Sequence, residues 1–175
     1  PPIDSEKNPS TDPRTEKDQP TEHFNQFMTK ILYKISGDTQ NDDLFLNPDL
    51  ITNIISLSSP SHKIDTRTYA VATIKNETHN INFRKILVKV SNFTDLFNVF
   101  NSTTKKPQLL QQCAAAMRNL ITEQANIDLL IKNNIQIHLI NSMLRFVDSA
   151  DYCYVCFRIL TKISGIEKVR KSLFN

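Results

Sequence analysis

A short apolar pattern that recurs four times is the feature that most constrains this chain of 175 residues. Each copy has two adjacent apolar residues, two variable positions and a third apolar residue. The copies are Ile31-Leu32-Ile35, Ala70-Val71-Ile74, Ala116-Met117-Leu120 and Ile159-Leu160-Ile163. Their final residues are 39, 46 and 43 positions apart, and periods of this size are typical of repeats built from two or three helices. We therefore predict a stack of helical repeats.

The two outer copies support the same interpretation, because residues 30–37 read KILYKISG and residues 158–165 read RILTKISG. Helical spacing of apolar residues, with caps and turns between the segments, predicts ten helices. They cover residues 21–36, 50–57, 64–75, 81–90, 93–100, 109–121, 127–131, 135–147, 152–164 and 167–174. The order in each unit is a short helix, a middle helix and a long helix. The last segment is the first helix of an incomplete unit.

Several residues predict where these helices begin and end. Thr21, Asn47 before Pro48, and Ser91 or Asn92 are expected to cap helix N-termini. Gly37 is expected to end the first helix in a left-handed conformation. Asn133-Asn134 is expected to form a tight corner, since Asn tolerates that conformation. The polar segment 38–43 is expected to interrupt the helices, and the Phe-rich segment 93–100 to lie in the core.

The first 20 residues differ from the rest of the chain, since they hold five of its eight prolines and almost no apolar residue. We expect residues 1–20 to be a disordered linker or tail and residues 21–175 to form the repeat domain. The chain begins with Pro1 and not with Met, so we expect a fragment of a longer protein or a processed end. It contains no secretory signal and no apolar run of about 18 residues, which excludes a membrane span on sequence grounds.

Charge and reactive residues predict no catalytic site. Residues 1–22 carry six acids and three bases, a net charge of −3. Since the whole chain has a net charge of +3, the remaining residues carry a net charge of about +6. This is less basic than a dedicated nucleic-acid module. The pair Cys153 and Cys156 has the spacing of a redox or zinc motif, but it falls inside a predicted helix, so we interpret both as buried structural thiols. With only two glycines and four scattered histidines, we expect no phosphate loop, no metal, no cofactor and no enzyme activity.

This arrangement resembles the armadillo repeat family. The resemblance covers about residues 24–175, is closest over residues 126–164, and includes the phrase Ala115-Ala116-Met117-Arg118-Asn119-Leu120 at the end of a third helix. It departs in three ways: Asn replaces the corner glycine, the first unit has only a stub of a first helix, and the family's groove tryptophans are absent. The resemblance implies an all-α fold, a right-handed α-α superhelix with about three repeats and partial end units.

The resemblance also implies a binding groove, because armadillo stacks hold extended peptides on the concave face of their third helices. The family's contact positions are the Asn of the ending phrase and the residue four earlier, one turn apart on the same helix face. In this chain they are Lys30, Lys34, Tyr69, Thr73, Ala115, Asn119, Arg158 and Lys162. Basic residues at both ends of this column favour an acidic or phosphorylated partner.

The first functional hypothesis is therefore a non-catalytic adaptor or scaffold that binds a partner polypeptide in this groove. Alternatives are an internal stack of a larger assembly whose ends are covered by adjoining repeats, and a basic helical repeat that binds nucleic acid. Three cysteines without a disulfide-type spacing favour a reducing compartment, so we expect an intracellular protein, cytoplasmic or nuclear.

Overall fold

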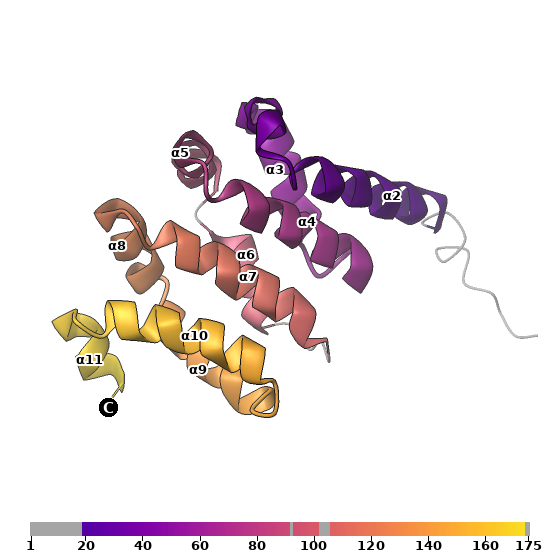
Figure 1. Ribbon diagram of the computed structural model, residues 1–175. Helices are drawn as coiled ribbons and strands as arrows, with labels where there is room; N and C mark the ends of the chain where they lie inside the picture. The colour runs from indigo at the N-terminus through magenta and orange to yellow at the C-terminus, as the bar shows by residue number, and fades with distance from the viewer. Residues whose placement is uncertain (1–18, 92, 102–105, 174–175) are drawn as a thin grey trace, which may run out of the picture.

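Four long helices, here called the third helices, contain the four copies of the recurring apolar pattern. They are α2 (Gln19–Ile35), α4 (Ile64–Glu77), α7 (Pro107–Leu120) and α10 (Ala150–Ile163). The computed structural model describes residues 19–91, 93–101 and 106–173. In it α4 packs against both α2 and α7, and α7 packs against α10, so the helices stack in chain order and run in the same direction (Figure 1). The predicted parallel stack is confirmed.

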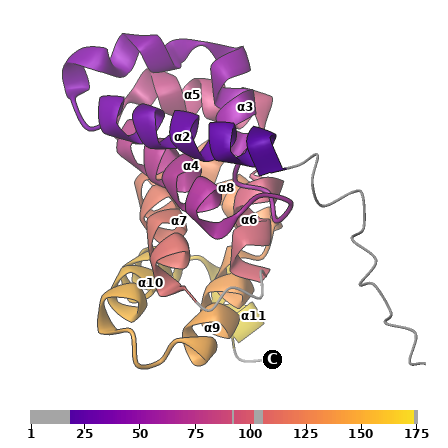
Figure 2. The same cartoon turned by 90° about the vertical axis from the view of Figure 1, so that its right-hand side faces the viewer.

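A second row of helices lies behind the first. It consists of α3 (Pro48–Ser56), α6 (Thr94–Asn101) and α9 (Ile135–Arg145), which pack against one another and each against the third helix of its own unit. Among the described residues, three shorter helices connect the two rows: η1 (Thr39–Leu46), α5 (Ile81–Val90) and α8 (Gln124–Lys132). A fourth, α11 (Glu167–Leu173), follows the last third helix. Figure 2 shows α2 at one end of this elongated arrangement and α9 with α10 at the other. The fold is thus an all-α solenoid.

The core runs continuously between the two rows. Ile74, Leu120 and Ile163, which end three copies of the apolar pattern, are completely buried. Ile35, which ends the first copy, is only half-buried because α2 has a neighbouring third helix on one side alone. The predicted burial of the Phe-rich segment is confirmed, since the large side chains Phe93, Leu96, Phe97, Val99 and Phe100 are all buried.

Two asparagine side chains cap helices: Asn47 does so as the sequence predicts, and Asn80 caps the helix predicted at residues 81–90. The Asn47 carboxamide oxygen accepts hydrogen bonds from the backbone N–H groups of Asp49 (2.8 Å) and Leu50 (3.2 Å) at the start of α3. The Asn80 carboxamide oxygen accepts from the N–H groups of Asn82 (2.9 Å) and Phe83 (3.4 Å) at the start of α5. Each side chain therefore satisfies backbone donors that have no partner inside the helix.

The corners before two of the second helices use left-handed residues. Asn134 has φ of 54° immediately before α9, which confirms the predicted corner. Phe93 has φ of 59° immediately before α6, where the sequence predicts helix. Positive φ is uncommon for a bulky residue, and here the Phe93 ring is completely buried while its N–H donates to the Ser91 hydroxyl at 2.9 Å. Tertiary packing thus holds this corner together with the hydroxyl of Ser91, one of the two residues predicted to cap the helix, while the other, at position 92, lies outside the described residues.

Three local predictions are wrong or shifted. Gly37 does not adopt positive φ; its N–H donates to the Lys34 carbonyl at 3.3 Å, so the expected left-handed cap is absent there. The expected polar interruption at residues 38–43 is largely helical, because the Asp38 side chain accepts from the Gln40 N–H and starts η1. The helix α2 begins at Gln19, so Thr21 lies inside it and is not its cap. Of the tail expected to be disordered, residues 1–20, Gln19 and Pro20 belong to α2, and residues 1–18 lie outside the described part of the chain.

Candidate binding face of the third helices

The predicted contact residues lie on four successive parallel helices, but they differ in exposure. Lys30 and Lys34 on α2 are exposed, and so are Arg158 and Lys162 on α10. On the two middle helices, Tyr69, Ala115 and Asn119 are half-buried, whereas Thr73 is 1% exposed. The Thr73 hydroxyl donates to the Tyr69 carbonyl at 2.9 Å. We therefore leave Thr73 out of the candidate site.

The Asn119 amide joins two repeats. Its Nδ2 donates a hydrogen bond to the Thr78 hydroxyl at 3.0 Å, and Thr78 is the residue that follows the end of α4. A similar bond joins the preceding pair of third helices, where Asn76 Nδ2 donates to the Ser36 hydroxyl at 3.0 Å. Asn119 thus has a structural role between α4 and α7, beside any contact its carbonyl oxygen makes to a partner.

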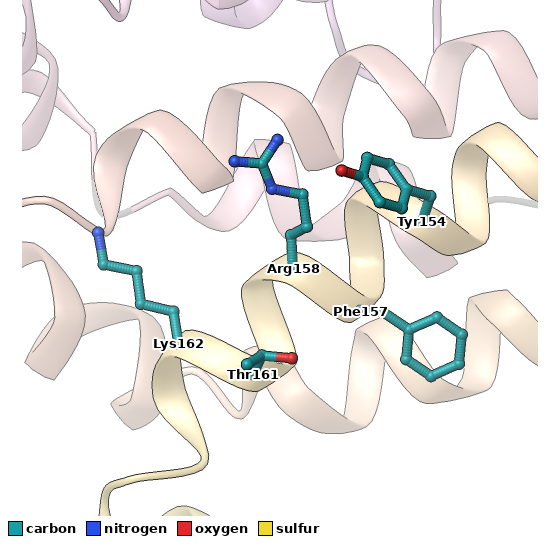
Figure 3. A pocket seen from close by; sticks show the side chains of 5 residues that line it. All are labelled: Tyr154, Phe157, Arg158, Thr161 and Lys162. Atoms are coloured by element: carbon teal, nitrogen blue, oxygen red, sulfur yellow. The ribbon is translucent and has the colours of Figure 1, made fainter.

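Tyr33 and Tyr154, which lie beside the predicted contact residues of α2 and α10, add aromatic surface at the two ends of the column. The rings of Tyr33 on α2 and Tyr69 on α4 have centroids 5.7 Å apart. On α10 the Arg158 guanidinium lies 5.7 Å from the centroid of the Tyr154 ring, a cation–π contact. Figure 3 shows Tyr154, Arg158 and Lys162 extending from one side of α10, while Phe157 extends from the other. With Thr161 these four side chains line an open pocket of about 390 Å³.

Each third helix carries one basic residue in its last turn. These residues are Lys34 on α2, Lys75 on α4, Arg118 on α7 and Lys162 on α10. We call this set the cation row. Positive charge at a helix C-terminus interacts favourably with the helix dipole, which explains the residue type in part. Within the described ranges, however, no acidic side chain forms an ion pair with any of the four.

The middle of the cation row is electrostatically unfavourable without a ligand. Burial lowers the pKa of the Lys75 ammonium, and the nearby charge of Arg118 lowers it further. Arg118 itself is half-buried, and its guanidinium has only a long contact of 3.5 Å to the Asn119 carboxamide oxygen. Two like charges are therefore held together in partly buried positions, where a bound anion would interact favourably with both.

The two cysteines that have the spacing of a redox or zinc motif, Cys153 and Cys156, lie on the helix α10. Cys156 is completely buried, as expected, and burial raises the pKa of its thiol to about 12. Cys153 is half-buried, so the expected burial is only partial there. Among the described residues there is no group of three His, Cys, Asp or Glu side chains that could hold a metal ion. None of the described helices is long and apolar enough to cross a membrane.

Four residues of this face are not among the contact positions that the sequence predicts: Lys75, Arg118, Tyr33 and Tyr154. Lys75 lies one residue after the final apolar residue of its copy and Arg118 lies two residues before, so a search at one fixed register finds neither. The signal that could have found them is the basic residue in the last turn of every long helix. Tyr33 occupies a variable position of the first copy and Tyr154 lies before the last copy, so the recurring pattern selects neither, and only their ring contacts identify them.

No protein-family model and no curated protein matches this sequence. Among solved structures, the chain is similar to a designed armadillo repeat protein, YIII(Dq)4CqI, with a TM-score of 0.69 and 15% sequence identity. The similarity covers 83% of this chain and 63% of the designed chain. At this identity the likeness concerns the fold alone, and it agrees with the stacked third helices in Figure 1. The chain therefore has an armadillo-like repeat fold.

Proposed function

We propose that this protein is a non-catalytic interaction module that binds an acidic or phosphorylated segment of a partner polypeptide across its third helices. The observation that carries the proposal is the cation row, in which four parallel helices each offer one basic side chain without an acidic partner among the described residues. Lys30 and Arg158 add two exposed charges one turn earlier on the outer helices. A phosphate or carboxylate is the natural ligand of such groups.

The spacing of the helices suggests how the partner lies. Packed helices are about 8–10 Å apart, and an extended chain in the polyproline II conformation advances about 3.1 Å per residue with about three residues per turn. A segment that crosses the four helices would therefore place about three residues over each one. In that conformation every third side chain lies on the same face, so we expect acidic residues at roughly every third position of the bound segment. The Tyr33–Tyr69 pair offers an apolar surface to the residues between them at the α2 end.

A polypeptide suits this surface better than a small molecule. In a repeat stack each unit contacts only its neighbours, so the surface is long and open and does not close into a pocket. Small-molecule sites, in contrast, bury most of their ligand in a concave cavity. The cavity beside Arg158 is open and is lined by a single helix, which fits one side chain of a bound peptide.

The proposal is tested by fluorescence anisotropy with a labelled peptide in which Glu occupies every third position. The variant Lys34→Glu with Lys162→Glu reverses the two exposed ends of the cation row. Two exposed ion pairs of up to about 1 kcal/mol each correspond to roughly a tenfold or greater loss of affinity. Both side chains are exposed, so the helical circular dichroism should not change.

The matched control is Lys85→Glu with Lys132→Glu, which makes the same charge change on exposed residues of α5 and α8. This control should bind the peptide nearly as well as the unmodified chain. Equal losses in both variants would show unspecific charge attraction and contradict the proposal. A labelled single-stranded DNA that binds more tightly than the peptide, with a steep salt dependence, would favour a nucleic-acid-binding function instead.

A further inference from the structure

The far end of the stack has an apolar face that nothing in the described chain covers. A cavity of about 590 Å³ lies between α9 and α10, lined by Ile140, Met143, Leu144, Val147, Cys153, Phe157 and Leu160. Leu144, Val147 and Phe157 are 74%, 70% and 58% exposed. We call this surface the α9–α10 end face. Exposed apolar side chains gathered in this way are typical of an interaction site.

The repeat pattern identifies what this face is built to contact. When Leu120 of α7 is matched with Ile163 of α10, Cys153, Phe157 and Leu160 correspond to Leu110, Ala114 and Met117. The three α7 residues are completely buried, and α7 has third helices packed on both sides. The α9–α10 end face is therefore the surface that in the inner units packs against the following repeat.

The helix α2 at the opposite end has the complementary exposure. Phe24 and Phe27 on α2 are each 62% exposed. When Ile35 is matched with Ile163, they correspond to Tyr152 and Val155 of α10, which are 0% and 9% exposed. Tyr152 contacts Ser142 of its own second helix α9 and Phe146 just after it, so Phe24 is open because α2 has no second helix of its own unit among the described residues. Phe27 is open at the position that Val155 buries inside the stack. Figure 2 shows that α2 and α10 lie at the two ends of the molecule.

The helix α11 lies after α10 as the first helix of a unit lies after the third helix of the unit before it. Arg170 Nη1 on α11 donates to the carbonyls of Ser164 (3.3 Å) and Gly165 (2.8 Å), just after α10. Arg84 Nη1 on α5 makes the equivalent bonds to the two carbonyls just after α4. The helix α11 therefore holds the place of a first helix, in a unit that has no third helix among the described residues. The helix α2 is a third helix with no preceding neighbour in the part of the chain that the structure describes.

We propose that copies of this chain associate head to tail, with α2 of one copy seated on the α9–α10 end face of the next. The contact would continue the packing of α2 on α4, α4 on α7 and α7 on α10 by one further step. This inference is independent of the proposed peptide binding. Because the two contacting surfaces differ, the association does not close into a symmetric pair and instead adds copies in one direction.

The cation row determines whether added salt strengthens or weakens the association between copies. Stacking places Lys162 of one copy beside Lys34 of the next, so the interface combines apolar contact with repulsion between like charges. Added salt screens the repulsion and leaves the apolar contact intact. Association should therefore strengthen with salt, whereas an association driven by opposite charges would weaken.

The experiment is sedimentation velocity of the full chain over a range of concentrations, with two variants that each block one end. Phe24→Glu with Phe27→Glu blocks the α2 end, and Leu144→Glu with Phe157→Glu blocks the α9–α10 end face. The unmodified chain should grow beyond two copies as its concentration rises. Each variant alone should sediment as one copy, and an equal mixture of the two should form a pair and nothing larger, since each retains the surface that the other lacks.

The matched control is Ile81→Glu, an exposed apolar residue on α5 (49%) that belongs to neither end, and it should associate like the unmodified chain. Circular dichroism checks that each variant is folded. A monomeric unmodified chain at high concentration would overturn the proposal, as would a mixture of the two variants that stays monomeric. Pairing of the α2-blocked variant with itself would also overturn it, because that result indicates a symmetric contact between two α9–α10 end faces.

Discussion

The side chain of Asn119 on α7 donates a hydrogen bond of 3.0 Å to the hydroxyl of Thr78, which itself donates to the Lys75 carbonyl at 2.7 Å. Thr78 is completely buried. The chain of donors therefore connects one repeat to the last turn of the preceding one. In the family that this chain resembles, the equivalent Asn is a peptide contact, and here the same residue also fastens two repeats together.

The first prediction concerns this link. Asn119→Ala should lower the free energy of unfolding by about 1 kcal/mol, because it removes a partly buried hydrogen bond. Urea denaturation monitored by circular dichroism measures the change. A double-mutant cycle with Thr78→Ala separates the bond from other effects of each substitution. Fully additive losses in the double variant would show that the two side chains do not interact.

The second prediction concerns Glu77, whose side chain is completely buried at the end of α4 and has no hydrogen-bond partner for either oxygen among the described residues. Burial, and after it the charge of Asp42, raise the pKa of this carboxyl from 4.5 to about 7, against the opposing effect of His79. Between these two pH values the folded state keeps a proton that the unfolded state has lost. The stability that Glu77 contributes is therefore complete below pH 4.5 and lost as pH rises through about 7.

Glu77→Gln removes this titration without changing the shape of the side chain. At pH 8 the variant should exceed the unmodified chain in stability by roughly 3 kcal/mol, because one pKa unit corresponds to about 1.4 kcal/mol. The difference should shrink as pH falls toward 4.5, the ordinary pKa of the carboxyl. Thermal denaturation across this pH range measures it, and two stability curves that stay parallel would contradict the assignment to Glu77.

The third prediction compares two arginines that occupy equivalent places in different units. Arg84 donates to the carbonyls of Thr78 and His79, and its Nε forms an ion pair with Glu123 at 3.0 Å while only 12% of the side chain is exposed. Arg170 makes the same carbonyl contacts from an exposed position. Arg84→Met should therefore lower the unfolding free energy by about 2 kcal/mol, and Arg170→Met by less than about 1 kcal/mol. Equal losses would show that burial does not decide the strength of this contact.

Much of the fold could be predicted because its signals are local. The apolar pattern places Ile74, Leu120 and Ile163 in the core, and the side chain of Asn47 caps the helix it precedes. These features depend on helical spacing and on hydrogen bonds within three residues. The left-handed corner at Asn134 follows for the same reason, since Asn tolerates that backbone conformation by itself.

The remaining features depend on packing between distant segments. The left-handed Phe93 is held by burial of its ring, so its own residue type gives no indication of the corner. Thr73 shares the register of the predicted contact column, but α4 is packed between α2 and α7, which buries it. Lys75 and Arg118 differ in register and approach each other only because their helices end at the same edge of the stack.

The fourth prediction tests the central claim, that the cation row is where an acidic polypeptide binds. In two-dimensional NMR of the isotope-labelled chain, the peptide with Glu at every third position should shift amide signals in the last turns of α2, α4, α7 and α10, near Lys34, Lys75, Arg118 and Lys162. Signals of α3, α6 and α9, in the row behind, should stay in place. Shifts confined to the second row or to the α9–α10 end face, with the signals of the four third-helix ends unchanged, would contradict the account.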